Sequence, residues 1–142
     1  MRKILLLILT LFLGNLTGKS FAVADARELV DLPQMMQQHM LANMRDHLAA
    51  INDILAYLRS GETDKAAETA EFRLGMSSLP VHGASHMAKF MPEKMRLTGT
   101  AMHKAASRFA LTAQEGDLLA AYNAVSDITA ACVACHEQYR IQ

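Results

Sequence analysis

Tryptophan is absent from this 142-residue chain, and cysteine, proline and aromatic residues are scarce. There are two cysteines, three prolines and 6% aromatic residues, and the 14 basic residues balance the 14 acidic ones. Two cysteines cannot supply the several spaced disulfides on which small exported proteins often depend. The lack of a basic excess and of aromatic side chains for base stacking argues against nucleic-acid binding. We therefore expect stability to come from a hydrophobic core, a cofactor or both.

The N-terminal segment has the layout of a secretory signal peptide. Two basic residues precede an apolar run over residues 4–13 in which Thr10 is the one polar residue, and a small-x-small sequence ends at Ala24. The run is shorter than the roughly 20 apolar residues that a membrane-spanning helix needs. We predict a signal peptide over residues 1–24, cleaved after about Ala24, and one periplasmic domain over residues 25–142. A retained N-terminal anchor is the alternative.

Helical patterns dominate the predicted domain, since sustained alternation is missing and β-branched residues are few beside Ala, Leu, Met, Glu, Gln and Lys. The spacing of apolar residues predicts helices over about 33–59, 64–74, 92–113 and 118–140. The connection over residues 76–91 is long for a compact helical protein. Helices with one apolar face each pack most simply as an antiparallel four-helix bundle, so the predicted fold class is all-α.

Both cysteines belong to one motif, Cys132-Val-Ala-Cys135-His136. In a C-x-x-C-H sequence the two thiols can bond to the vinyl groups of haem, and the imidazole can reach the iron. On a helix these three residues share one face. A zinc site would need two more ligands, and a redox dithiol would need a βαβ setting, while two unmodified cysteines are the plain alternative. We predict one covalent haem c, attached at Cys132 and Cys135, with His136 as an iron ligand.

The end of the chain resembles the class II c-type cytochromes, which comprise cytochrome c′ and its low-spin relatives. The resemblance rests on a C-terminal C-x-x-C-H followed by Tyr139 and Arg140, and it covers residues 25–142 in length and layout but only the final helix closely. It implies periplasmic electron transfer with redox partner proteins, or binding of nitric oxide and carbon monoxide at an open iron site. It also implies a possible homodimer through the first two helices.

Two apolar stripes run along the first predicted helix. One passes through Met40, Met44, Ile51, Ile54 and Leu58 with His47 beside it, and the other passes through Leu41, Met44, Leu48, Ile51, Leu55 and Leu58. The resemblance implies that low-spin members place a methionine iron ligand on this helix, roughly four turns before its final glycine. Met44 is the prediction, because it belongs to both stripes; Met40, His47 and an open iron site are the alternatives.

The resemblance also assigns roles to two residues that follow the motif. Arg140 matches a basic residue beside the proximal haem face, although a charge that interacts with the last helix carbonyls is an equal alternative. Tyr139 is expected to pack in the core.

Methionine and histidine are concentrated in the first helix, the connection and the third helix. Most of these methionines are expected to fill the core. Thioether and imidazole are also the groups that bind Cu(I), and His82, His86, Met87 and Met91 lie close together in the connection. A copper-binding protein is therefore an alternative function, although we expect the native protein to hold no copper. No feature indicates a hydrolytic or group-transfer active site, so we expect no enzyme.

Overall fold

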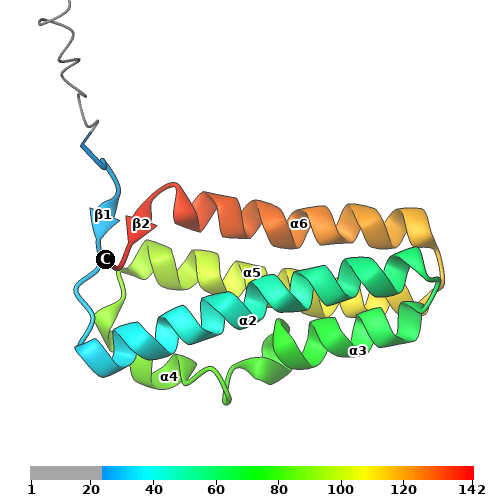
Figure 1. Ribbon diagram of the computed structural model, residues 1–142, viewed down its shortest axis with the longest axis horizontal. Coiled ribbons are helices and arrows are strands. Elements are labelled where there is room, and N and C mark those ends of the chain that lie inside the picture. The colour runs from blue at the N-terminus through cyan, green and yellow to red at the C-terminus, as the bar shows by residue number, and fades with distance from the viewer. Residues whose placement is uncertain (1–23) are drawn as a thin grey trace, which may run out of the picture.

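The structure is a computed structural model that describes residues 24–142, and these residues are mostly helical (Figure 1). In chain order the elements are β1 (Glu28–Leu29), α2 (Gln34–Arg59), α3 (Thr63–Arg73), the 3-10 helix η2 (Met76–Ser78), α4 (Ala84–Met87), the 3-10 helix η3 (Ala88–Phe90), α5 (Glu93–Gln114), α6 (Leu118–His136) and β2 (Tyr139–Arg140). The all-α prediction is confirmed. The predicted signal peptide lies outside the described residues apart from Ala24.

Local sequence signals account for the ends of the long helices. Pro33 and Pro92 immediately precede α2 and α5, where a missing backbone N–H costs nothing. Gly61 follows α2 with a φ of +75°, a conformation that glycine adopts without strain. The Asp117 carboxylate begins α6 by accepting a hydrogen bond from the backbone N–H of Ala120 at 3.0 Å. The predicted starts of the first three helices agree with the structure to within one residue.

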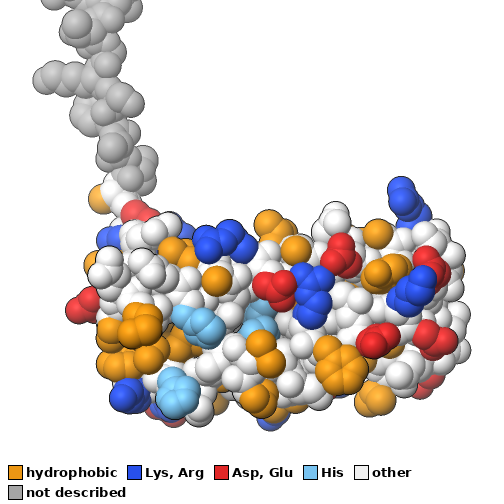
Figure 2. Space-filling view, turned by 60° about the horizontal axis from the view of Figure 1, so that its bottom comes forward, with side chains coloured by type: hydrophobic (Ala, Val, Ile, Leu, Met, Phe, Trp, Pro, Cys, Tyr) orange, Lys and Arg blue, Asp and Glu red, His pale blue; other side chains and the backbone are white. Residues whose placement is uncertain are grey.

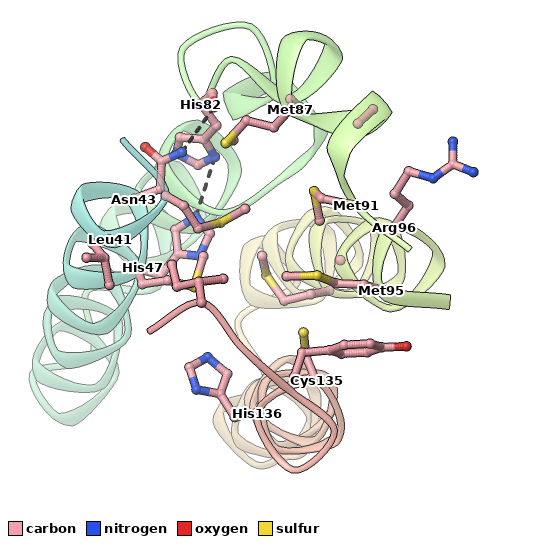
Figure 3. Close-up of a pocket in the computed structure, with 18 of the residues that line it drawn as sticks. Leu41, Asn43, His47, His82, Met87, Met91, Met95, Arg96, Cys135 and His136 are labelled. Atoms are coloured by element: carbon pink, nitrogen blue, oxygen red, sulfur yellow. Dashed lines mark hydrogen bonds between the residues drawn. The ribbon is translucent and has the colours of Figure 1, made fainter. Parts of the chain in front are cut away.

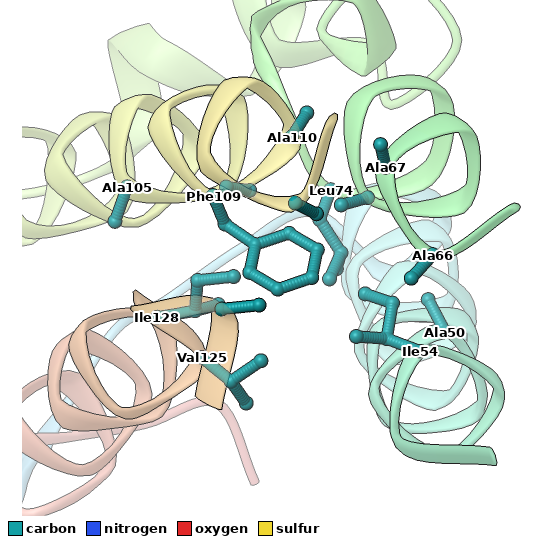
Figure 4. Close-up of a cluster of buried hydrophobic side chains, with 14 of the residues drawn as sticks. Ala50, Ile54, Ala66, Ala67, Leu74, Ala105, Phe109, Ala110, Val125 and Ile128 are labelled. Carbon is teal, nitrogen blue, oxygen red and sulfur yellow. The ribbon is translucent and has the colours of Figure 1, made fainter. Parts of the chain in front are cut away.

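The four long helices lie side by side and enclose the main core (Figure 1). Helix α5 packs along both α6 and α3, α3 packs against α2, and α2 has few close contacts with α6. The fully buried ring of Phe109 fills the centre, where Ile54, Leu74, Val125 and Ile128 surround it (Figure 4). These side chains come from α2, the end of α3, α5 and α6, so the core ties the long helices together.

A second, smaller apolar cluster occupies the end of the molecule that carries the strands. It consists of Val30, Leu32, Met40, Met87, Met95 and Tyr139. Tyr139 is only 7% exposed, which confirms its predicted place in the core. Cys135 packs against this cluster, whereas Cys132 packs against the main core. The C-x-x-C-H turn therefore lies where the two clusters meet.

The last predicted helix is too long, because α6 ends at His136. Tyr139 and Arg140 form β2 instead, and they pair in parallel with Glu28 and Leu29 of β1. The hydrogen bonds of this pairing connect residues more than a hundred positions apart, so the apolar spacing near the end of the chain carries no sign of them. The prediction that strands are absent is wrong for these two short strands.

Apolar side chains also lie on the surface. Leu48 and Leu55, on the second predicted stripe of α2, are 73% and 40% exposed, so that stripe is wrong as a buried face. The face shown in Figure 2 is hydrophobic toward one end, where His side chains also reach the surface, and acidic side chains lie mostly toward the other end.

Among residues 24–142, α6 alone is long and apolar enough to cross a membrane, but a helix packed in a protein core can have the same length and composition.

Candidate functional site

A cavity of about 660 Å³ opens at the strand end of the molecule, between α2, the connection, α5 and the end of α6 (Figure 3). Its volume lies in the range of small-molecule and cofactor sites. Six methionines line it: Met40, Met44, Met87, Met91, Met95 and Met102. The charged side chains among the described lining residues are Arg27, Arg96 and Arg140, with no Asp or Glu. The cavity is thus mainly apolar, and its charged side chains are all positive.

The C-x-x-C-H turn forms one wall of this cavity. Cys135 and His136 line it, and Cys132 lies one turn earlier, half-buried. In Figure 3 the Cys135 thiol points from α6 toward the side of the cavity that holds Met95. Burial raises the pKa of both thiols, which are not joined in a disulfide. The His136 ring is exposed to solvent on one side and borders the cavity on the other.

The three candidates for the second iron ligand, Met40, Met44 and His47, all lie on α2 and line the same cavity. Met40 and His47 are buried, whereas Met44 is half-buried. Facing them, Gly99 of α5 also lines the cavity, and a Cβ atom built on it would meet no atom within 4 Å. The wall at Gly99 is therefore hollow, and the space between the two helices has room for a bulky group.

An arginine pair lies at the edge of the cavity. The Nε atom of Arg140 is fully buried and has no hydrogen-bond partner among the described residues. The nearest carboxylate, that of Asp25, lies 3.6 Å from this Nε atom. Asp25 makes a closer ion pair with Arg27, at 2.7 Å, and the hydrogen bonds from Arg27 hold the pKa of Asp25 well below its usual range. Buried N–H groups normally have an acceptor, so Arg140 could bind an anionic group of a ligand here.

Sequence reasoning missed a cluster of three buried histidines beside the cavity, two of which, His47 and His82, are labelled in Figure 3. His47, His82 and His103 come from α2, the connection and α5, and each is at most 9% exposed. Their ring centroids lie 4.8, 5.8 and 5.7 Å apart. His103 lies four residues after Gly99, on the apolar stripe of α5, and this spacing is the one signal that could have placed it inside.

Hydrogen bonds hold the three rings in place. The Nε2 atom of His47 lies 3.4 Å from Nδ1 of His82, which is also 3.2 Å from the Ser78 hydroxyl. The Nδ1 atom of His103 lies 2.6 Å from the Leu74 carbonyl oxygen. Because a carbonyl oxygen only accepts, His103 carries its proton on Nδ1 and has a free lone pair on Nε2.

Burial lowers the pKa of all three histidines, because an apolar surrounding disfavours the charged form. For His47 the pKa falls to about 4, and the neighbouring rings of His82 and His103 contribute after burial. The three imidazoles are therefore neutral near pH 7. Their lone pairs are available as acceptors or metal ligands.

The copper ligands predicted in the connection are only partly brought together. His82, Met87 and Met91 line the cavity, but His86 is exposed and lies outside it. Within residues 24–142, no three His, Cys, Asp or Glu side chains already form a complete metal-binding group. Of the four copper ligands predicted in the connection, only His82, Met87 and Met91 therefore share the cavity.

The chemistry of the cavity fits a covalently attached haem. One helical turn offers two thiols and an imidazole, apolar walls offer volume, and the buried Nε of Arg140 offers a donor for a carboxylate such as a haem propionate. Thioethers and imidazoles on the far wall are possible second iron ligands. In comparisons with known proteins, no family model matches the chain, and no curated protein or solved structure matches it.

Proposed function

We propose that this chain is a periplasmic monohaem c-type cytochrome that transfers electrons to and from partner proteins rather than catalysing a reaction. In this proposal the four long helices form an antiparallel four-helix bundle, as in the class II cytochromes that the sequence resembles. The observation that carries the proposal is the position of the C-x-x-C-H turn, which opens onto a cavity lined by six methionines.

Each residue of the turn has a defined role in this proposal. Cys132 and Cys135 would hold the haem through thioether bonds, and His136 would bind its iron. When bound, the haem supplies a one-electron couple between ferric and ferrous iron. The apolar walls exclude water, which together with axial ligation sets the potential. Arg140 offers its unpartnered Nε–H to a carboxylate at the edge of the cavity.

Met44 is the proposed second iron ligand. Its competitors are already engaged, since the Nε2 atom of His47 contacts His82 at 3.4 Å and Met40 packs in the smaller apolar cluster. Met44 also packs against that cluster, but it is only half-buried and lines the cavity, so its thioether is more accessible than that of the buried Met40. Methionine ligation raises the potential and favours ferrous iron, which suits an electron carrier.

Haem attachment is tested directly by denaturing electrophoresis with haem staining and by intact mass. Protein from a host with cytochrome maturation should keep the stain and gain the mass of one haem. Cys132→Ala together with Cys135→Ala should abolish both, whereas Val133→Ala, in the same turn and 54% exposed, should not. A wild-type chain of bare mass would refute the proposal.

Electron transfer is separated from gas binding by visible spectra of the oxidised and reduced protein, with and without carbon monoxide. A low-spin spectrum in both states that carbon monoxide leaves unchanged would support the electron carrier. A high-spin spectrum that shifts on addition of carbon monoxide would replace it by the gas-binding function of an open iron site.

A homodimer through α2 and α3 is part of the proposal. Leu48 on α2 and Phe72 on α3 are 73% and 64% exposed, and such large apolar side chains favour burial against a partner. Sedimentation equilibrium of wild-type and Leu48→Lys protein would test it. Loss of the dimer in the variant would support this interface, and a wild-type monomer at all concentrations would contradict it.

A further inference from the structure

We propose that His47, His82 and His103 form a binding site for one Cu(I) ion at the end of the cavity opposite the C-x-x-C-H turn. From the sequence alone we expect no copper, because the connection by itself offers a poor ligand set. The fold changes this expectation by bringing three imidazoles together from three separate segments. The site uses the same cavity as the proposed haem, but its ligands do not depend on haem being attached.

Two of the three ligands are already spaced for one metal ion. The Nε2 atom of His47 and the Nδ1 atom of His82 lie 3.4 Å apart. Two imidazole nitrogens bound about 2.0–2.1 Å from one tetrahedral metal lie roughly 3.3 Å from each other. The two nitrogens therefore already have the separation of two ligands of one ion, and each ring would turn its lone pair toward that ion.

His103 is the third ligand. Its ring centroid lies 5.8 Å from that of His47 and 5.7 Å from that of His82. Its Nδ1–H donates to the Leu74 carbonyl at 2.6 Å, which leaves the Nε2 lone pair free. A backbone carbonyl that fixes the far nitrogen is the usual support of a metal-binding histidine. Rotation of this ring toward the other two would complete the ligand set.

Protonation does not oppose binding at this site. The three imidazoles are neutral near pH 7, because burial lowers the pKa of each. In the metal-free protein one ring proton lies between His47 and His82. That proton can move to the other nitrogen of its own ring when the ion binds, so each ring keeps one N–H and no proton has to leave.

The surroundings favour a singly charged, soft ion. No Asp or Glu is among the described residues that line the cavity, and the carboxylate that acts on His47 and His82 from outside it, Asp46, is already paired with Arg73 at 2.6 Å. Little negative charge is thus available to balance the second charge of Zn²⁺ or Cu²⁺ in this apolar space. Thioethers of Met87 and Met102 line the same cavity and can join the imidazoles. Neutral nitrogen and thioether ligands together are typical of Cu(I).

The test is an anaerobic titration of the isolated protein with Cu(I) in competition with a chromogenic chelator such as bicinchoninate. We expect one equivalent of Cu(I) to bind. His82→Ala and His103→Ala should each weaken binding at least tenfold, whereas the matched control His86→Ala, an exposed histidine of the same connection, should bind as the wild type does. The haem spectrum of each sample, recorded beforehand, reports the proposed function separately.

Several outcomes would overturn the site. These are failure of the wild type to compete with the chelator, an equal loss in His86→Ala, or stoichiometric binding of Zn²⁺ without Cu(I). X-ray absorption of the copper-loaded wild type needs no variant, and a spectrum without imidazole scattering would also overturn it. Loss of the low-spin haem spectrum in His47→Ala would assign that ring to iron and exclude it from copper. If the protein carries haem but does not bind Cu(I), only the copper site is refuted. If it binds Cu(I) but carries no haem, only the proposed cytochrome function is refuted.

Discussion

Acidification should destabilise this protein well before its carboxylates are protonated. Burial lowers the pKa of His47 from 6.5 to about 4 in the folded chain, and the unfolded chain restores the ordinary value. Between these two pKa values the unfolded state binds a proton at His47 and the folded state does not. Stability is therefore full above pH 6.5 and is lost as the pH falls toward 4.

The size of this effect follows from the two pKa values. Linkage gives a loss of about 2 kcal/mol at pH 5 and about 3 kcal/mol at pH 4 for His47 alone. His82 and His103 act in the same direction, since burial lowers their pKa as well. Arg73 lowers the pKa of Asp46, so the contribution of that carboxylate is lost only below about pH 4 and does not overlap this window.

Urea unfolding of copper-free protein at pH 7, 6 and 5 measures the effect as a change in the free energy of unfolding. The variant His47→Gln should show a smaller pH dependence, because it removes one of the three buried titrating rings. The exposed control His86→Gln should keep the wild-type dependence. Stability that stays constant or rises between pH 7 and pH 5 would show that the rings are not held neutral by burial.

Three further predictions concern the site and the core. Met44→Ala should turn a low-spin haem into a high-spin one that binds carbon monoxide. If Met44→Ala keeps the low-spin spectrum and Met40→Ala loses it, the iron ligand is Met40, one turn earlier. Phe109→Ala should lower the free energy of unfolding by about 3–5 kcal/mol in urea, because it empties the centre of the core. Gly83→Ala should cost about 1–2 kcal/mol, since Gly83 has a φ of +61° and the added Cβ would lie 3.1 Å from Nε2 of His39. A loss below 0.5 kcal/mol at Gly83 would show that the connection relaxes freely.

The long helices were predictable because their signals are local. Proline before α2 and α5, glycine after α2 and the spacing of Met95, Met102 and Phe109 all act within a few residues. The spacing within the C-x-x-C-H motif is local in the same way. Sequence reasoning therefore located the motif and three helices without knowledge of the tertiary fold.

Features that depend on distant contacts were not predictable. The pairing of Tyr139 with Glu28 ends α6 early, and helical spacing contains no record of a partner so far away. The histidine cluster likewise needs α2, the connection and α5 to be packed before its members meet. Leu48 on α2 shows the opposite error, because its apolar character alone led to a buried position that the packing does not provide.

The pairing of β1 with β2 has a consequence for the order of folding. Arg27 and His136, whose contact accompanies this pairing, are 109 positions apart in the chain. Closing so long a loop is entropically slow, whereas the α2/α3 and α5/α6 hairpins close over short turns. We therefore expect the wall of the cavity beside the motif to form last. If haem is attached as proposed, Cys132 and Cys135 would be accessible to that reaction before the strand pair forms and less accessible afterwards.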